Sequence, residues 1–238
     1  MADGDIAIDT RVTPSFQSAN VRALPEYDAD TAPLFGPVES AFDLAYRTIS
    51  SIHAAREAAQ NDLTLTEAAR VVKTADFADS LMERATRAFD YADSTLVNNI
   101  AALDKALSEP VQARAAHTIS VEIRAHVKGL KAEGGSILDF VQRAIDSGDH
   151  DTVSAILGSP AYLSGMTPEQ QTVMLRRYHE KANPQTAKRL AAAKAAQAYL
   201  GRNSGLLFKE IEKGIGGDYR QIALLRKGAS ASKKAFGI

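Results

Sequence analysis

Residues Leu65–Leu107 decide the fold; they read LTEAARVVKTADFADSLMERATRAFDYADSTLVNNIAALDKAL, 43 residues without a proline or a glycine. Apolar residues recur in this run at steps of 3 or 4, which places them on one face of an α-helix: Leu81, Ala85, Phe89, Ala92, Leu96, Ile100, Leu103 and Leu107. The spacing is close to an eleven-residue repeat and favours a straight or slightly right-handed helix. Such a helix would be roughly 65 Å long, far longer than the usual one of about a dozen residues. The alternative is a kink near Asp76 or Ser94.

Two further helices flank this run and predict a long-helix bundle over residues 37–132. On the N-terminal side, Pro37 suits the first turn of a helix. Thr64 and Glu67 have the spacing of a capping box, which predicts that the long helix begins there. On the C-terminal side, Pro110 suits the first turn of a third helix. Three helices with short connections predict antiparallel packing.

After residue 132 the pattern changes to short helices, and residues 133–227 are predicted to form a basic subdomain. Thr167 and Gln170 make a second capping box, and Gly201 suits the end of the alanine-rich helix before it. The other helices are expected at 137–145, 152–157, 206–213 and 219–227. The sequence shows neither a convincing strand nor an internal repeat. The predicted fold class is therefore all-α, with an extended N-terminal arm, a long-helix antiparallel bundle and a subdomain of short helices.

Both ends of the chain are predicted to lie outside this helical body. Residues 1–36 contain three prolines and keep no helical or strand period, which predicts an extended arm that is ordered only against its own body or a neighbouring subunit. Residues 228–238 follow Gly228 and predict a flexible tail. The tail is either a frayed end, a hook for nucleic acid, or a peptide that docks into a partner. The docking hypothesis assigns partner contacts to Lys233, Lys234, Phe236 and Ile238.

The composition is that of a globular chain, with 45% hydrophobic and 24% charged residues. It contains no cysteine, which excludes disulfides, thiolate zinc sites and cysteine nucleophiles. The amino-terminal residues MADGDIAIDTRVTP lack the apolar core of a secretory signal, and no apolar run is long enough to span a membrane. We therefore expect a soluble protein with no membrane span.

The net charge of −1 conceals a gradient along the chain. Residues 1–100 carry 8 Lys and Arg against 16 Asp and Glu, residues 101–150 carry 6 against 7, and residues 151–238 carry 14 against 6. Such asymmetry is typical of a nucleic-acid-binding end or of head-to-tail contact between copies of one chain. The alternative is a chance gradient on solvated faces.

No motif for catalysis or metal binding occurs in the sequence. His117 and His126 are nine residues apart, which places them on opposite faces of one helix, and HEKAN at His179–Asn183 lacks the second histidine of a zinc protease motif. DSGDHD at Asp146–Asp151 is interpreted as a turn with helix-capping aspartates. KGIGGDYR at Lys213–Arg220 follows a helix rather than a strand, which favours a hinge over a phosphate loop. We expect no catalytic residue, no metal and no cofactor, and a protein that is not an enzyme.

The basic C-terminal third has two interpretations, contact with nucleic acid or contact with an acidic protein surface. The candidate contact residues are Arg176, Arg177, Lys188, Arg189, Arg226 and Lys227. Aromatic residues do not alternate with these cations, so stacking on bases is not indicated. Binding to nucleic acid would therefore be non-specific.

The alanine-rich, cysteine-free helices and the stretch AILGSPAYLSGMTPEQQ (Ala155–Gln171) resemble small structural proteins of tailed bacteriophages, of the capsid, head–tail connector or internal ejection type. This resemblance covers about the last half of the chain. It implies a non-catalytic assembly protein of the virion, assembled in the host cytoplasm, whose partners are other copies of itself and neighbouring structural proteins. The competing hypothesis is a cytoplasmic helical protein that binds nucleic acid through its basic third.

Overall fold

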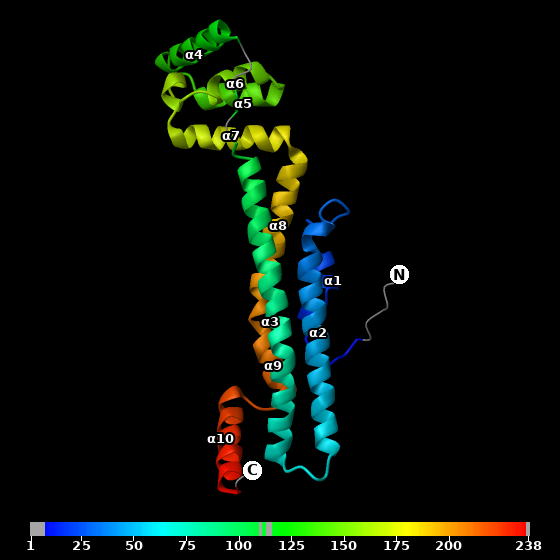
Figure 1. Cartoon of the computed structure of the whole chain (residues 1–238). Coiled ribbons are helices and arrows are strands. Elements are labelled where there is room, and N and C mark those ends of the chain that lie inside the picture. Colours follow the sequence, from blue (N-terminus) through cyan, green and yellow to red (C-terminus); the bar gives the residue numbers. More distant parts are fainter. Residues whose placement is uncertain (1–7, 110, 113–115, 237–238) are drawn as a thin grey trace. The chain divides into compact units, whose positions relative to one another are not determined.

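A computed structural model describes residues 8–109, 111–112 and 116–236 (Figure 1). It confirms the all-α class, because the described residues form helices and turns and contain no strand. The helices in chain order are η1 (Pro14–Phe16), α1 (Ala19–Arg22), α2 (Ala32–Asn61), α3 (Glu67–Ala106), α4 (His117–Ala132), α5 (Ile137–Ser147), α6 (His150–Leu157), η2 (Ala161–Ser164), α7 (Pro168–Ala182), α8 (Pro184–Ser204), α9 (Leu206–Ile215) and α10 (Tyr219–Phe236).

The contacts divide the chain into two compact units, which differ from the predicted bundle at 37–132 and subdomain at 133–227. Unit 1 joins residues 1–98 to residues 192–238, and unit 2 consists of residues 99–191. The division differs because the helices pack against other helices than the prediction assumed. In unit 1, α9 packs against α2, whereas α4 packs against α5, α6 and η2 in unit 2. The third helix of the predicted bundle therefore belongs to the other unit.

The long run around Leu96 forms a single helix, α3, which confirms the central prediction. The residue that caps its N-terminus differs from the prediction and is Thr66 instead of Thr64. Thr66 lies directly before Glu67, and its Oγ1 accepts a hydrogen bond from the backbone N–H of Ala69 at 3.3 Å. Thr64 does not cap the helix, because Asp62 Oδ1 accepts both its hydroxyl at 2.6 Å and its N–H at 3.0 Å.

Unit 1 is built around Phe42 of α2, whose ring contacts three segments that are distant in sequence. The ring centroid of Phe42 lies 5.7 Å from that of Phe16, 5.3 Å from that of Phe89 on α3 and 5.3 Å from that of Tyr199 on α8. Figure 1 shows α2 and α3 running antiparallel with α9 beside them. Small buried residues on α3 and α8, such as Ala92 and Ala196, let the helices approach this aromatic centre closely.

Residues 8–31 pack against the body of their own unit, which is one of the two predicted alternatives, but they form short helices rather than an extended arm. They contain η1 and α1, and Phe16 and Val21 are fully buried in unit 1. Polar contacts hold the same segment: Ser50 donates to Asp9 Oδ2 at 2.7 Å, and the N–H of Thr13 donates to Glu210 Oε2 at 3.3 Å. The irregular spacing of the apolar residues hid this packing, because neither a helical nor a strand period connects them.

Pro37 was predicted to lie in the first turn of α2, but it lies inside the helix. The helix begins at Ala32 and has Pro33 in its first turn. Pro33 occupies the position where the backbone N–H has no partner in any case. Pro37 removes one backbone hydrogen bond, to the carbonyl of Pro33, and the helix continues past this loss. The buried residues Leu34, Phe35 and Val38 surround it and hold this first part of α2 in place.

Unit 2 is a set of short helices around one apolar core. Its fully buried residues include Val127, Val141 and Ile156, which come from α4, α5 and α6. The predicted capping box of α7 is confirmed: Thr167 Oγ1 accepts from the N–H of Gln170 at 3.2 Å and Gln170 Oε1 accepts from the N–H of Thr167 at 3.0 Å. The predicted third helix starts at His117 within the described residues, and Pro110 lies outside them.

The last two helices extend further than predicted. α8 passes through Gly201 and ends at Ser204, and α10 passes through Gly228 and ends at Phe236. The expected flexible tail at 228–238 is therefore helical up to Phe236, while Ile238 lies outside the described residues. Glycine in a helix interior costs only about 1 kcal/mol relative to alanine, and the leucine, arginine and lysine before Gly228 and the alanine after it are good helix formers.

Candidate functional site

The candidate site is α10, whose first half is attached to unit 1. Ile222 is 1% exposed, and the hydroxyl of Tyr219 lies 3.3 Å from the sulfur of Met82. Nη2 of Arg226 donates to Asp76 Oδ1 and to Asp79 Oδ2, each at 2.7 Å. Burial lowers the pKa of Arg226, but the hydrogen bonds to the two carboxylates outweigh this and raise the pKa above its ordinary value.

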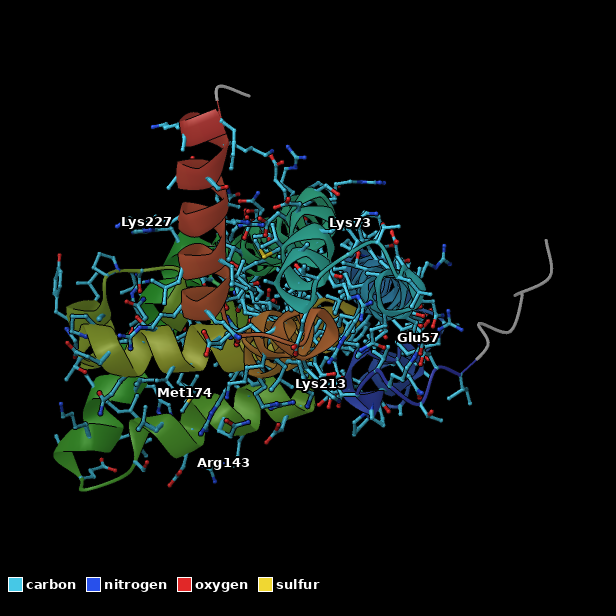
Figure 2. All side chains as sticks on the ribbon, turned by 90° about the horizontal axis from the view of Figure 1, so that it is seen from below. Glu57, Lys73, Arg143, Met174, Lys213 and Lys227 are labelled. Carbon is cyan, nitrogen blue, oxygen red and sulfur yellow. The ribbon has the colours of Figure 1, made fainter. Side chains whose placement is uncertain are left out.

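The second half of α10 is exposed. Every residue from Lys227 to Phe236 is solvent-exposed within the described part of the chain, and the side chain of Phe236 is 78% exposed. Figure 2, in which Lys227 is labelled, shows these last turns standing clear of α3 and α9. The helix therefore begins against the body of unit 1 and continues for ten residues without packing on it.

One apolar stripe runs along both halves of α10. Ile222, Leu225, Ala229 and Phe236 follow one another at steps of 3, 4 and 7, so they lie on the same face of the helix. The stripe is buried at Ile222, partly buried at Leu225 and exposed from Ala229 onward. The face that attaches α10 to unit 1 thus continues into solvent, where Ser232 and Lys233 interrupt its apolar residues between Ala229 and Phe236.

The charge of α10 is uniformly positive. Residues 219–236 contain five basic side chains and no acidic one: Arg220, Arg226, Lys227, Lys233 and Lys234. Of these, Arg226 is engaged with Asp76 and Asp79, and the two lysines near the end are exposed beside the apolar stripe. The end of α10 therefore combines an apolar side chain with unscreened positive charge.

The predicted contact residues are divided between the two units. Arg176, Arg177, Lys188 and Arg189 belong to unit 2, whereas Arg226 and Lys227 belong to unit 1. Arg176 is occupied, because its Nη1 donates to Asp104 Oδ1 and its Nε to Glu180 Oε1, each at 2.7 Å, and these bonds raise its pKa. Arg177 donates to Gln142 Oε1 at 2.8 Å, and Lys188 and Arg189 are exposed.

Folding also cancels most of the charge gradient. The acidic first part and the basic last part of the chain belong to the same unit, so residues 1–98 and 192–238 carry 17 basic and 19 acidic side chains. Unit 2 carries 11 basic and 10 acidic side chains. Head-to-tail attraction between an acidic and a basic half is therefore not supported, because neither unit has a large net charge.

The sequence motifs examined for chemistry have structural roles. Asp149 of DSGDHD caps α6 by accepting from the N–H of Thr152 at 3.0 Å; the hydrogen bonds from Thr152 lower its pKa, and the capping interpretation is confirmed. Gly216 of KGIGGDYR ends α9 in the left-handed conformation, with φ 81°, so this stretch connects two helices as predicted. Among the described residues, no three histidine or acidic side chains come together in a way that would hold a metal ion.

The stripe of α10 is not among the features predicted from the sequence, although the sequence contains a signal for it. Ile222, Leu225, Ala229 and Phe236 have helical spacing, but Gly228 between them predicts the end of the helix. A glycine ends a helix reliably only when the backbone turns left-handed there. Gly228 has no positive φ, in contrast to Gly216.

Comparison with known proteins assigns this chain to no family. No protein-family model, no curated protein and no solved structure matches it. In the described ranges, no helix combines the length and the apolar character needed to cross a membrane.

Proposed function

We propose that this chain is a non-catalytic assembly protein that docks on a larger protein complex through α10. The observation that carries this proposal is the apolar stripe of α10, which is buried at Ile222 and uncovered at Phe236. The complex that fits best is the particle of a tailed bacteriophage, because the stretch Ala155–Gln171 resembles structural proteins of such particles. The proposal accounts for a helix that extends beyond the body of its own unit.

An uncovered helix of this kind gains stability from a partner. Isolated helices shorter than about 12 to 15 residues are marginal in water, and ten residues of α10 have only the preceding turns to support them. Burying a phenylalanine side chain contributes about 1.5–3 kcal/mol, so a pocket for Phe236 would stabilise both the contact and the helix. This is the mode in which an amphipathic helix binds a hydrophobic groove.

The partner that matches α10 is an acidic groove on a neighbouring structural protein. Five cations and no anion along the helix would steer it toward negative charge and disfavour a basic surface. A second copy of this chain is a weaker match, because unit 1 has 19 acidic against 17 basic side chains and unit 2 has 10 against 11. Self-association nevertheless gives a distinct outcome in the experiment below.

The alternative function is non-specific binding of nucleic acid through the cations of α10. The exposure of Lys227, Lys233 and Lys234 favours it. It does not account for the uncovered apolar stripe, since phosphate contacts need no phenylalanine. The predicted contact residues on α7 and α8 do not strengthen it, because Arg176 is already paired with two carboxylates.

The experiment that separates these functions measures the mass of the complexes formed by the full chain, alone and mixed with structural proteins encoded beside it. Phe236→Ser is expected to abolish a mixed complex, and Tyr162→Ser, at a position that is 72% exposed in unit 2, is the matched control that leaves it intact. Exchange of both Lys233 and Lys234 for Gln is expected to slow formation of the complex. If Phe236→Ser has no effect on any complex, docking through α10 is wrong.

The same variants decide the nucleic-acid alternative in a DNA-binding titration at increasing salt. A phosphate contact by both lysines predicts that their exchange lowers the slope of log K against log salt by about 2, whereas Phe236→Ser leaves it unchanged. A loss of self-complexes in the absence of any other protein would instead identify a second copy as the partner.

A further inference from the structure

A cavity of about 240 Å³ lies within unit 1, where the last turns of α2, the first turns of α3 and the end of α9 meet. Among the residues that line it are Arg56, Gln60, Glu67, Arg70, Thr74 and Gly216. We call it the arginine cavity, because both Arg56 and Arg70 line it. Its volume is sufficient for a small ligand and lies slightly below the usual range for drug-sized molecules.

The two arginines of the cavity differ in their ion pairs from three other arginines of the chain. Three arginines each bridge two carboxylates: Arg11 with Asp9 and Glu57, Arg176 with Asp104 and Glu180, and Arg226 with Asp76 and Asp79. Within the described residues, Arg56 and Arg70 make no ion pair at all. Arg56 Nη1 donates to the carbonyl of Lys213 at 3.3 Å, and Arg70 Nη2 donates to the carbonyl of Asp62 at 3.1 Å. Two arginines therefore line one cavity without a carboxylate in ion-pair contact with either of them.

The position of Arg56 is built into the fold. Gly216 has φ 81°, and a Cβ atom added to it would lie 2.4 Å from Cζ of Arg56. The guanidinium thus lies directly against the glycine backbone, and a side chain at this position would displace it. Arg70 is held by its hydrogen bond to the carbonyl of Asp62, whereas its Nε is shielded from solvent and has no hydrogen-bond partner in the part of the chain that the structure describes. An unpaired buried donor is costly, and a bound anion would compensate the charge of the same group.

The acidic groups near the cavity supply only part of that compensation. Asp62 Oδ1 accepts hydrogen bonds from Thr64, which lower the pKa of Asp62, and the charges of Lys73 and Arg70 lower it further to a smaller extent. Asp62 Oδ2 lies 3.8 Å from Lys73 Nζ and makes no ion pair with Arg70. Glu67 lines the cavity and is exposed, and its side chain contacts neither arginine in an ion pair. Its negative charge would lower the affinity for an anion without blocking the site.

We propose that the arginine cavity binds a phosphate group through Arg56 and Arg70. The planar guanidinium fork matches the oxygens of phosphate and forms charge-assisted hydrogen bonds with them. Two such forks in one cavity suit a doubly charged anion better than a singly charged one. The site is independent of α10 and of the docking proposed above, since it shares no residue with either.

The test is a calorimetric titration of the full chain with inorganic phosphate. Wild type is expected to bind, and Arg56→Gln and Arg70→Gln are each expected to lower the affinity about tenfold or more, as loss of a charge-assisted hydrogen bond requires. Glu67→Gln is expected to raise the affinity, because it removes the opposing charge. Arg84→Gln is the matched control; Arg84 lies exposed on the same helix as Arg70 and does not line the cavity.

Absence of saturable phosphate binding by the wild type would overturn the proposal, as would an equal loss of affinity in Arg84→Gln. Circular dichroism of each variant identifies any loss of folding. If Arg70→Gln does not fold, Arg56→Gln decides alone, because Arg56 contributes only one hydrogen bond to a backbone carbonyl.

A second titration distinguishes the sources of the phosphate group. If inorganic phosphate competes with a short DNA duplex, and Arg56→Gln weakens both, the cavity takes phosphates of a nucleic-acid backbone. If Arg56→Gln weakens phosphate alone, the cavity takes a small free phosphate compound. Both results support the site. If DNA binding neither responds to Arg56→Gln nor competes with phosphate, the cavity does not take the phosphates of a nucleic-acid backbone. The first titration then decides the proposal, and absence of phosphate binding there rejects it.

Discussion

At the residue scale, the backbone conformation at a single glycine affects where a charged side chain lies. Gly216 combines a left-handed backbone with direct contact to the guanidinium of Arg56. A side chain at this position would be strained by the backbone conformation and would displace the guanidinium. Gly217, the next residue, has no positive φ, and an added Cβ would meet Gln221 Oε1 at 3.3 Å and Val71 at 3.4 Å. The two neighbouring glycines therefore have different roles.

Substitution of these glycines tests the difference. Gly216→Ala is expected to lower the free energy of unfolding by about 2 kcal/mol, since it forces an L-residue into the left-handed region and displaces Arg56. Gly217→Ala is expected to change it by less than about 1 kcal/mol, because Gln221 is a flexible neighbour. Denaturant unfolding followed by circular dichroism measures both. Equal destabilisation by the two substitutions would contradict this account of Gly216.

Residue patterns predicted some caps correctly and others not, for a physical reason. Thr167 and Gln170 form the predicted box, although the side chain of Thr167 also hydrogen-bonds Glu169. Thr64 and Glu67 have the same spacing, but Asp62 lies two residues before Thr64 and accepts its hydroxyl instead. Spacing identifies candidates for a cap, and local competition between acceptors selects among them. The arginine cavity could not be predicted in this way, because Arg56 and Gly216 are far apart in sequence.

At the element scale, α3 was predictable because its signal is local and uninterrupted, whereas the ends of α2 and α10 were not. Pro37 and Gly228 both lie inside helices. Each costs one backbone hydrogen bond or some conformational entropy, and the rest of the helix outweighs that cost. Apolar neighbours surround Pro37, but only solvent surrounds Gly228 in the described structure. The helicity of the second half of α10 therefore depends on its own residues and not on packing.

Gly228→Ala tests the helicity of this segment. An added Cβ meets no atom within 4 Å, so the substitution is expected to stabilise α10 locally by about 0.5–1 kcal/mol. Hydrogen exchange of the backbone amides at 229–236 should slow in the isolated chain. Gly129→Ala in α4, where an added Cβ also meets nothing, is the matched control and should leave these amides unchanged. Unchanged exchange in Gly228→Ala would mean that the segment is not helical in the isolated chain, as the flexible-tail prediction had it.

At the scale of the whole molecule, the pairing of distant segments defines each unit. Phe42 gathers residues from the N-terminal segment, α3 and α8, and the acidic beginning of the chain shares a unit with its basic end. The all-α class followed from the sequence because helical periodicity is local. The division into units did not follow, because it depends on which helices pack together, and the alanine-rich helices of this chain offer several similar faces. Charge counted along the sequence therefore does not give the net charge of either unit.

Limited digestion of the monomer by trypsin tests this arrangement, because basic residues occur in both terminal segments. Cleavage is expected first after Lys227, Lys233 and Lys234, which lie on the uncovered part of α10 and open at little cost. Cleavage after Arg11 is expected much later. Its guanidinium bridges Asp9 and Glu57, and its carbonyl accepts from Lys213 Nζ at 3.3 Å, so access requires unfolding of the segment around buried Phe16.

Mass spectrometry of the fragments gives the order of cleavage. Phe16→Ser removes the contact with Phe42, so it should accelerate cleavage after Arg11 and leave the rate after Lys227 unchanged. If wild type were cut after Arg11 as fast as after Lys233, residues 8–31 would not be folded against α2 in the monomer. They would then be the arm that the composition alone predicted, and an assembly would have to order them.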